Sequence, residues 1–178
     1  MSFAYPVENE TEIKEILDDL RKTYHDARHH CYAWRLGAEK KNYRFNDDGE
    51  PSNSAGKPIY GQILSNDLTD ILIVVIRYFG GILLGVGGLI TAYRESAADA
   101  IHNNHIVEKK VYETFSVRFN YPQMNNVMTI IKDHNVDQFD QDFSLKCSLK
   151  LKIWIKESEM VTGKLKILED VIVDKLTI

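Results

Sequence analysis

The apolar run Ile71–Ile76 constrains the fold of this chain more than any other feature. Every side chain in it is apolar, so both faces of the segment need to be covered. The run is too short to cross a bilayer, and no stretch of about 18 uncharged apolar residues occurs elsewhere. It therefore predicts a central strand in a sheet of a globular domain.

Helices and further strands are predicted around this central strand. Asn9 and Glu12 form a capping box. The helix behind it has an apolar stripe made of Ile13, Ile16, Leu17, Leu20 and Tyr24. A second helix is predicted from Leu89, after a segment that holds five of the ten glycines. Shorter strands are predicted at 3–7, 31–36 and 43–45, which gives an α+β domain.

A new pattern begins near Glu108. Residues 115–121 alternate as a strand, Pro122 opens a helix, and residues 136–143 form an acidic strand. Apolar and polar side chains then alternate from 145 to 156, a helix is predicted over 160–168, and a last strand over 171–178. This βαββαβ order is that of a ferredoxin-like domain. We therefore predict an α+β protein with two domains, 1–108 and 109–178.

Charge is unevenly divided between these halves. The net charge is −4. Residues 1–108 carry 11 Lys and Arg against 16 Asp and Glu, and residues 109–178 carry 11 against 10. A duplex-DNA-binding protein is usually more basic, so nucleic-acid contact would need a local patch. Cys31 and Cys147 lie far apart, which predicts unpaired thiols in a reducing compartment. No signal peptide is visible, and we expect a cytoplasmic protein with no membrane partner.

The glycine-rich segment 80–88 is the first candidate binding feature. Gly85, Gly87 and Gly88 precede the predicted helix, where backbone amides form a nest that attracts anions. The spacing matches neither the Walker motif nor G-x-G-x-x-G. Two interpretations stay open: contact with phosphate or an RNA backbone, and a tight turn between strand and helix.

The second candidate binding feature is an acidic loop that contains Asp47, Asp48 and Glu50 and has Lys57 nearby. Clustered carboxylates can hold Mg²⁺ or act as an acid–base pair. The sequence Asp-Asp-Gly-Glu also favours a turn, because Asp and Gly tolerate turn conformations. A structural or partner-docking role of this loop is therefore the alternative.

The segment 25–31 is rich in histidine and ends at Cys31. His25 and His29 have helical metal-pair spacing, but the glutamate of H-E-x-x-H is absent and the segment lies where helix gives way to strand. We predict no metal site and no catalytic thiol there. Arg28 and Arg77 are better suited as forked anion donors.

The alternating strand 145–156 has one basic face. Lysines with one aromatic residue on an open sheet resemble surfaces on which RNA-binding modules stack bases. Asp137, Asp140 and Asp142 could instead pair with them across the sheet. This secondary basic face comprises Lys146, Lys150, Lys152, Trp154 and Lys156.

Four motifs in fixed order resemble a known family. They are Asp26-Ala-Arg-His-His-Cys31, Asp47-Asp-Gly-Glu-Pro51, Ala55-Gly-Lys-Pro58 and Arg77-Tyr-Phe-Gly-Gly-Ile-Leu-Leu-Gly85. Over residues 3–106 the chain resembles the IMPACT family, in its bacterial YigZ-like branch. The resemblance implies a two-layer first domain with a left-handed βαβ crossover, similar to domain IV of elongation factor G. It implies a second domain similar to domain V of that factor, and a strand that in bacterial members precedes the point where this chain begins.

The resemblance and the loop features lead to one functional expectation. We expect a non-enzymatic, translation-associated regulator that binds the ribosome, RNA or a translation factor, without cofactor, metal or catalytic residue. The alternatives are an enzyme acting on a phosphate-containing small molecule through the acidic loop, and a pure protein-interaction module. The sequence indicates no oligomeric state. The expected binding residues are Arg28, His29, His30, Asp47, Asp48, Glu50, Gly56, Lys57, Arg77, Tyr78, Gly80, Gly81, Gly85, Gly87 and Gly88.

Overall fold

The computed structural model of the chain describes residues 1–81, 83–144 and 146–176. It divides into two compact units, Met1–Val107 and Glu108–Ile178, each with its own sheet and core. Ile82, Leu145 and the last two positions of the predicted strand 171–178 lie outside the described residues. The predicted α+β fold is confirmed, with one four-stranded antiparallel sheet in each unit.

The first sheet has the order β1-β4-β2-β3. Its strands and helices are β1 (Ser2–Pro6), α1 (Glu10–Thr23), β2 (His29–Leu36), β3 (Asn42–Asn46), α2 (Gly56–Ser65), β4 (Ile71–Arg77) and α3 (Gly85–His102). The predicted capping box begins α1, since Asn9 Oδ1 accepts from the Glu12 amide at 3.0 Å and Glu12 accepts from the Asn9 side chain at 2.8 Å. The apolar run is β4, which lies between β1 and β2 as a central strand should.

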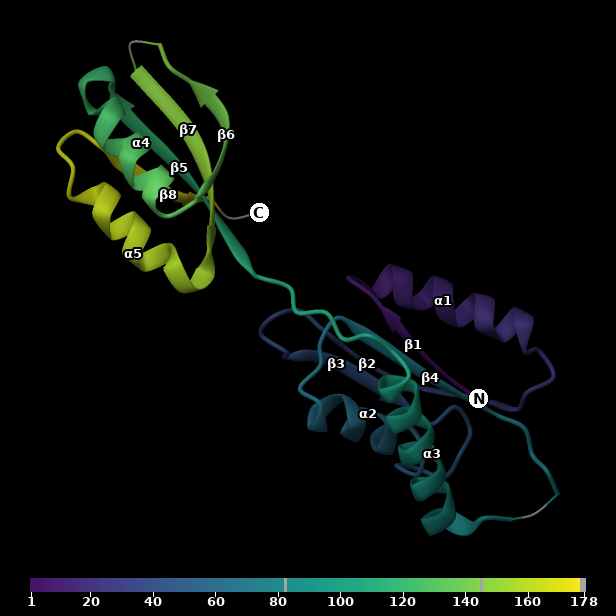
Figure 1. Cartoon of the computed structure of the whole chain (residues 1–178). Helices are drawn as coiled ribbons and strands as arrows, with labels where there is room; N and C mark the ends of the chain where they lie inside the picture. Colours follow the sequence, from purple (N-terminus) through teal and green to yellow (C-terminus); the bar gives the residue numbers. More distant parts are fainter. Residues whose placement is uncertain (82, 145, 177–178) are drawn as a thin grey trace. The chain divides into compact units, whose positions relative to one another are not determined.

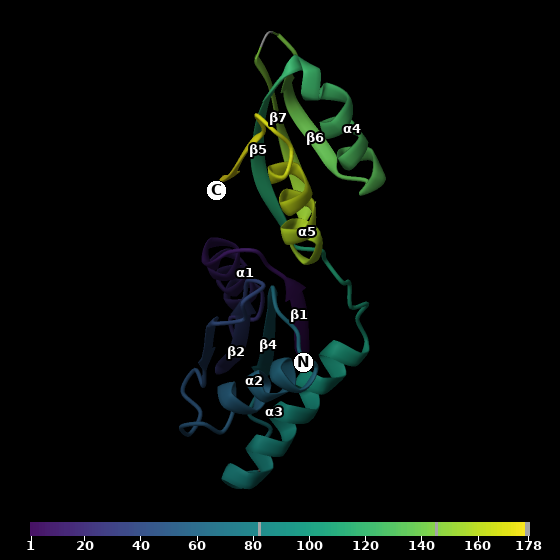
Figure 2. The ribbon, with the colours of Figure 1, turned by 90° about the vertical axis from the view of Figure 1, so that its left-hand side faces the viewer.

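Helices cover both faces of this sheet, so the first domain has three layers and not the expected two. α1 packs on the face that carries Trp34, Leu72 and Val74. α2 and α3 pack on the other face, over Ala33 and Ile73 (Figures 1 and 2). The reason lies in the sequence of β2 and β4, which is apolar at consecutive positions and therefore exposes apolar surface on both sides.

One connection in this domain is left-handed, as expected. β1 and β2 are parallel because both pair antiparallel with β4, and β3 and β4 are parallel because both pair antiparallel with β2. α1 joins the first pair over one face. α2 joins the second pair, whose strands run the opposite way, over the opposite face and in the reverse direction along the sheet. Two crossovers related in this way have opposite hands, whereas nearly all βαβ crossovers are right-handed.

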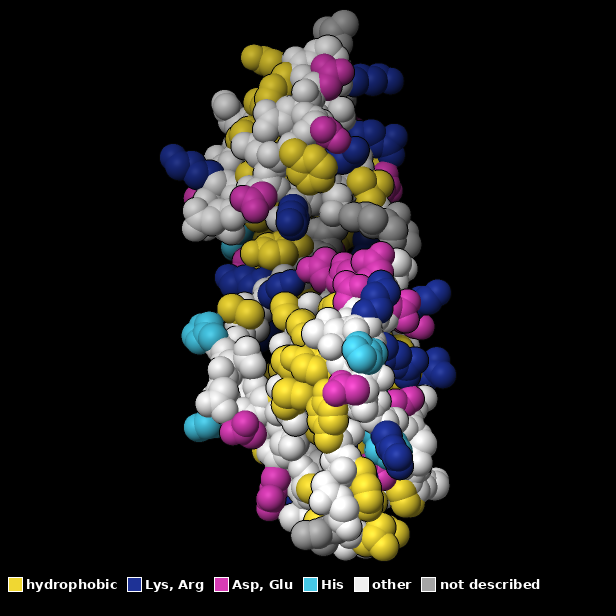
Figure 3. Space-filling model, turned by 90° about the vertical axis from the view of Figure 1, so that its right-hand side faces the viewer, with side chains coloured by type: hydrophobic (Ala, Val, Ile, Leu, Met, Phe, Trp, Pro, Cys, Tyr) yellow, Lys and Arg dark blue, Asp and Glu magenta, His cyan; other side chains and the backbone are white. Residues whose placement is uncertain are grey.

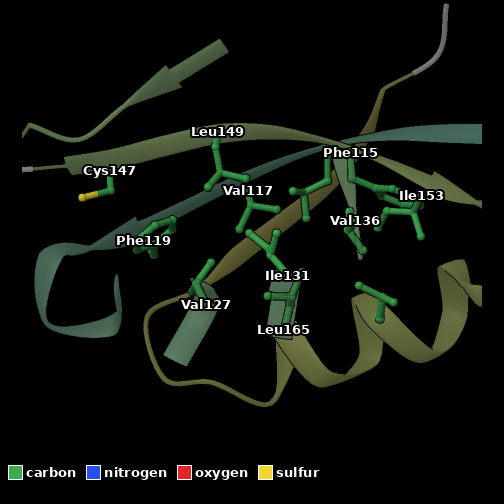
Figure 4. Packing of buried hydrophobic residues seen from close by; sticks show 12 residues of the cluster. Phe115, Val117, Phe119, Val127, Ile131, Val136, Cys147, Leu149, Ile153 and Leu165 are labelled. Atoms are coloured by element: carbon green, nitrogen blue, oxygen red, sulfur yellow. The ribbon is translucent and has the colours of Figure 1, made fainter. Parts of the chain in front are cut away.

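The second domain has the ferredoxin-like order β6-β7-β5-β8. Its elements are β5 (Tyr112–Asn120), the 3-10 turn η1 (Tyr121–Gln123), α4 (Met124–Asp133), β6 (Asp137–Asp142), β7 (Lys146–Trp154), α5 (Ile155–Lys166) and β8 (Ile172–Leu176). Both helices pack on one face of the sheet, where Val117, Leu149, Val127 and Leu165 meet in the core (Figure 4). Among the described residues, no helix of this domain covers the opposite face (Figures 1 and 2).

Two element boundaries differ from the predictions and matter for function. α3 begins at Gly85 and not at Leu89. β7 ends at Trp154 and α5 begins at Ile155, so Lys156 lies on a helix and not on the predicted strand. None of the helices in the described residues combines the length and apolar composition that a bilayer crossing needs.

Candidate functional site

The acidic loop between β3 and α2 is built around the carboxylate of Asp47. Its Oδ1 accepts hydrogen bonds from the amides of Ala55 and Gly56 at 3.0 and 2.8 Å, and its Oδ2 accepts one from the Asn53 amide at 2.9 Å. Ala55 stands at the N-cap of α2 but has no capping side chain. Asp47 supplies the missing cap and a negative charge at the helix N-terminus.

Asp48 ties the same loop to α1 and β2. Its Oδ1 accepts from the Arg21 guanidinium at 2.9 Å, and its Oδ2 accepts from the His30 amide at 2.7 Å. Its carbonyl lies 2.9 Å from Nδ1 of His29. The Asp48 backbone is left-handed, with φ of 41°, a conformation that aspartate tolerates better than most residues.

Glu50 points into the domain, and its side chain is 4% exposed. Its Oε1 accepts hydrogen bonds from the Arg77 guanidinium and from the Tyr93 hydroxyl, both at 2.7 Å. Nε2 of His29 lies 3.9 Å away. The Sγ of Cys31 is 3.4 Å from the Tyr93 hydroxyl oxygen. This buried polar cluster joins the acidic loop to the end of β4 and to α3.

Two groups in this cluster are held in their protonated forms. Burial is the main cause that raises the pKa of the Cys31 thiol to about 12, and the charges of Glu50, Asp48 and Asp47 add to it. Burial also raises the pKa of the Tyr93 hydroxyl, with contributions from Cys31 and Glu50. A reactive cysteine needs a stabilised thiolate, so this environment is the opposite of a nucleophile's. Both cysteines are free and buried, as predicted.

We expect Cys31 to resist alkylation in the folded protein. At about pH 9 an exposed thiol is mostly ionised and reacts readily, whereas Cys31 is fully buried and ionises only near pH 12. Iodoacetamide labelling followed by peptide mass spectrometry should leave the Cys31 peptide unmodified until denaturant is added. Rapid labelling of that peptide at neutral pH in the native protein would contradict the burial of this cluster.

The three carboxylates of the loop are therefore engaged by the protein itself. Asp47 binds backbone amides, Asp48 binds Arg21 and a strand amide, and Glu50 is buried against Arg77. A general acid or base has to reach a proton on the substrate, and Glu50 has no open path to one. Within residues 1–81, 83–144 and 146–176, no group of three or more His, Cys, Asp or Glu side chains is placed to hold a metal ion.

The glycine-rich segment, by contrast, lies open. Because α3 begins at Gly85, the three glycines of its first turn carry amides that have no acceptor within the helix. Among the described residues, the amides of 78–81, 83 and 84 donate to no other protein group. A Cβ would meet no atom within 4 Å at Gly80, Gly81, Gly85 or Gly87.

Apolar side chains project from this same segment, and apart from Tyr78 they were not among the expected binding residues. Leu83 is 86% exposed, and four others are between 44% and 54% exposed: Tyr78, Phe79, Leu84 and Val86. Figure 3 shows hydrophobic side chains gathered at the end of the first domain where Figure 1 places this segment. Contiguous exposed apolar side chains mark interaction surfaces. We call this segment, Tyr78–Gly81 with Leu83–Gly88, the glycine-rich surface.

The expected binding residues therefore separate into two groups. The inward group holds the acidic loop and consists of His29, His30, Asp47, Asp48, Glu50, Gly56 and Arg77. The outward group consists of Arg28, Lys57, Tyr78, Gly80, Gly81, Gly85, Gly87 and Gly88. Arg28 and Lys57 form no ion pair with a described carboxylate, and the Tyr78 hydroxyl donates to Asp26 at 2.8 Å. Arg77 belongs to the inward group because its guanidinium binds Glu50. The Cζ of Arg77 also lies 5.8 Å from the centre of the Phe79 ring.

The secondary basic face of the second domain is only partly neutralised. Lys150 pairs with Asp140 at 2.7 Å, as the cross-strand alternative predicted. Lys146, Lys152 and Lys156 form no ion pair with a described carboxylate. Lys156 remains next to this face although it lies on α5, because its Nζ is 5.1 Å from the centre of the Trp154 ring.

Comparisons with known proteins agree with this architecture. A family model described as the Impact N-terminal domain matches residues 1–101. The chain is 36% identical to IMPACT family member YigZ of Escherichia coli (strain K12) over 120 residues, 66% of this chain and 59% of the relative. It is 34% identical to IMPACT family member YvyE of Bacillus subtilis (strain 168) over 127 residues, 71% of this chain and 58% of the relative. The match thus spans less than two thirds of either relative.

A solved structure extends the likeness to both domains. It is titled "Crystal structure of an hypothetical protein", has a TM-score of 0.67 and 27% identity, and covers 99% of this chain and 87% of that chain. The family model covers more than half of the 178 residues. The chain therefore belongs to the IMPACT family, in its bacterial YigZ-like branch.

Proposed function

We propose that this protein is a non-enzymatic regulator of translation that binds the ribosome through the glycine-rich surface of its first domain. Membership of the IMPACT family and the resemblance to domains of elongation factor G support a role in translation. One structural contrast carries the rest of the proposal. The carboxylates that could perform acid–base chemistry are hydrogen-bonded to the domain itself, while the amides and apolar side chains of Tyr78–Gly81 and Leu83–Gly88 face outward.

The first turn of α3 is suited to an anionic partner such as an RNA backbone. α3 runs from Gly85 to His102, and its aligned peptide dipoles place partial positive charge at the glycine end. Three of the first four residues there have no side chain, so a phosphate oxygen can approach the amides closely. The exposed Leu83 and Phe79 add apolar contact with a base or a ribosomal protein.

We expect Gly87→Glu to weaken ribosome binding by about tenfold or more, which corresponds to about 1.4 kcal/mol or more. The side chain fits in open space, and a carboxylate at a helix N-terminus favours the helix, so the fold is retained. The new charge lies where a phosphate would bind and repels it. Co-sedimentation with purified bacterial ribosomes measures the effect.

Gly61→Glu is the matched control, because Gly61 is also a helical glycine and a Cβ added to it would meet no atom within 4 Å. It should bind ribosomes like the unmodified protein. Binding should also fall steeply as salt rises, since phosphate contacts release counterions. Equal binding by both glutamate variants would remove the glycine-rich surface from the proposal.

A pure protein-interaction module is the second candidate, and the exposed apolar side chains favour it. In that case Leu83→Ser would abolish binding, while Gly87→Glu and added salt would have little effect. The same sedimentation experiment therefore separates the two functions.

A further inference from the structure

The uncovered face of the second sheet carries aromatic rings on neighbouring strands. Tyr112 of β5 lies directly opposite Trp154 of β7, and Phe139 of β6 lies opposite Lys150 of β7. Tyr112 and Phe139 are exposed and Trp154 is half-buried, so all three rings reach the surface. Because α4 and α5 pack on the other side, these rings are not part of the domain core.

Each ring has a lysine ammonium over it. Lys110 lies 4.6 Å and Lys156 5.1 Å from the centre of the Trp154 ring. Lys152 lies 5.0 Å from the centre of the Tyr112 ring, and Lys150 lies 5.9 Å from that of Phe139. Figure 3 shows Lys and Arg side chains interleaved with hydrophobic ones on this domain. We call Tyr112, Trp154, Lys110, Lys152 and Lys156 the aromatic–lysine platform.

Positive charge on the platform is left without carboxylate partners. Lys110, Lys152 and Lys156 form no ion pair with a described carboxylate, although Asp137 stands opposite Lys152 in the sheet. Elsewhere on the same sheet two cations are neutralised, although Lys146 at the other end of β7 also pairs with no described carboxylate. Lys150 pairs with Asp140 at 2.7 Å and Arg118 with Asp174 at 2.6 Å. Three unneutralised lysines therefore gather where the two largest rings meet.

Flat rings beside unpaired lysines fit single-stranded nucleic acid better than other anions. Unpaired bases stack on aromatic faces while the adjoining phosphates bind the cations. A duplex keeps its bases inside its stack, and an acidic peptide would use the lysines but not the rings. The register also places Thr114 beside Lys152 and Ser116 beside Lys150. Their hydroxyls can bond a ribose 2′-hydroxyl, which favours RNA over DNA.

We propose that the aromatic–lysine platform of the second domain binds single-stranded RNA by stacking bases on Tyr112 and Trp154. The bases displace the ammonium groups from the ring faces, and Lys110, Lys152 and Lys156 turn to the phosphates. The inference goes beyond the proposed function, since it concerns a different domain and does not depend on the glycine-rich surface.

Tryptophan fluorescence of the full chain tests stacking directly. Trp34 is 4% exposed in the first domain, so a change on adding oligouridylate reports Trp154. We expect quenching by oligouridylate and weaker quenching by the equivalent DNA. Binding of labelled RNA, followed by anisotropy, should weaken about 5- to 100-fold in Trp154→Ala and Tyr112→Ala. Lys152→Ala should reduce the salt slope by about 0.7.

Lys132→Ala is the matched control, because Lys132 lies on α4, which covers the other face of the sheet. It should bind RNA normally. Polyphosphate and polyglutamate should neither quench Trp154 nor compete strongly. Equal affinity for polyglutamate with unaltered binding by Trp154→Ala would overturn the proposal in favour of an acidic protein partner.

Discussion

Replacing Asp47 with alanine is expected to lower the free energy of unfolding of the first domain by about 3–5 kcal/mol. The carboxylate accepts three backbone hydrogen bonds, at 2.8 to 3.0 Å. Ala55 and Gly56 are buried, so their amides would be left without an acceptor or access to water. Each buried unsatisfied donor costs about 1–3 kcal/mol, and loss of the α2 cap adds about 1 kcal/mol.

Urea unfolding followed by fluorescence measures this effect. In a Trp154→Phe background the remaining tryptophan is Trp34, which is buried in the first domain. Asp19→Ala is the control, because the Asp19–Lys22 pair lies on the surface and should contribute less than about 1 kcal/mol. Full stability of Asp47→Ala, together with loss of turnover on a phosphate-containing small molecule, would favour the enzyme alternative instead.

The sequence predicted the fold well because hydrophobic periodicity reports burial directly. The run Ile71–Ile76 predicted β4, and the order of elements after residue 108 predicted the ferredoxin-like topology. Periodicity was less informative at the end of β7, where the alternation continues through Ile155 and Lys156. Ile155 is 47% exposed, so the alternation there is not evidence of a buried strand face. Helix α5 instead buries Ser158, Val161 and Leu165 at helical spacing.

The start of α3 was predicted four residues late for a different reason. Glycine is unfavourable inside a helix, so Gly85–Gly88 reads as a loop. In the first turn, however, the amides need no helical acceptor, and the apolar packing of Leu89 and Tyr93 fixes the helix beyond. The shift moves the three glycines from a turn before the helix to its exposed N-terminus.

The direction in which the acidic loop faces could not be predicted from local sequence. Asp-Asp-Gly-Glu is compatible with both a solvated turn and an inward-facing one. What decides between them is Tyr93, which binds Glu50 from 43 positions away in the chain. Tyr93 was not among the residues singled out from the sequence. Glu50 and Arg77 were both singled out, yet their pairing depends on the crossover that brings β4 beside the loop.

Gly56→Ala is expected to destabilise the first domain by about 3 kcal/mol, at the upper end of what overpacking usually costs. A Cβ on Gly56 would lie 2.7 Å from the Asn46 amide nitrogen and 2.8 Å from its carbonyl carbon and oxygen. These are backbone atoms at the end of β3, so no side-chain rotation can relieve the contact. Either β3 or the start of α2 has to move, which also lengthens the hydrogen bonds that Asp47 makes.

Gly61→Ala, five positions along the same helix, should have the opposite effect. A Cβ there meets no atom within 4 Å, and alanine is favoured over glycine inside a helix by about 1 kcal/mol. Urea unfolding of the two variants, with Trp34 as the probe, should move the midpoint in opposite directions. If Gly56→Ala were as stable as the unmodified protein, α2 could not lie in such close contact with β3, and Asp47 would lose its role as the remote cap of that helix.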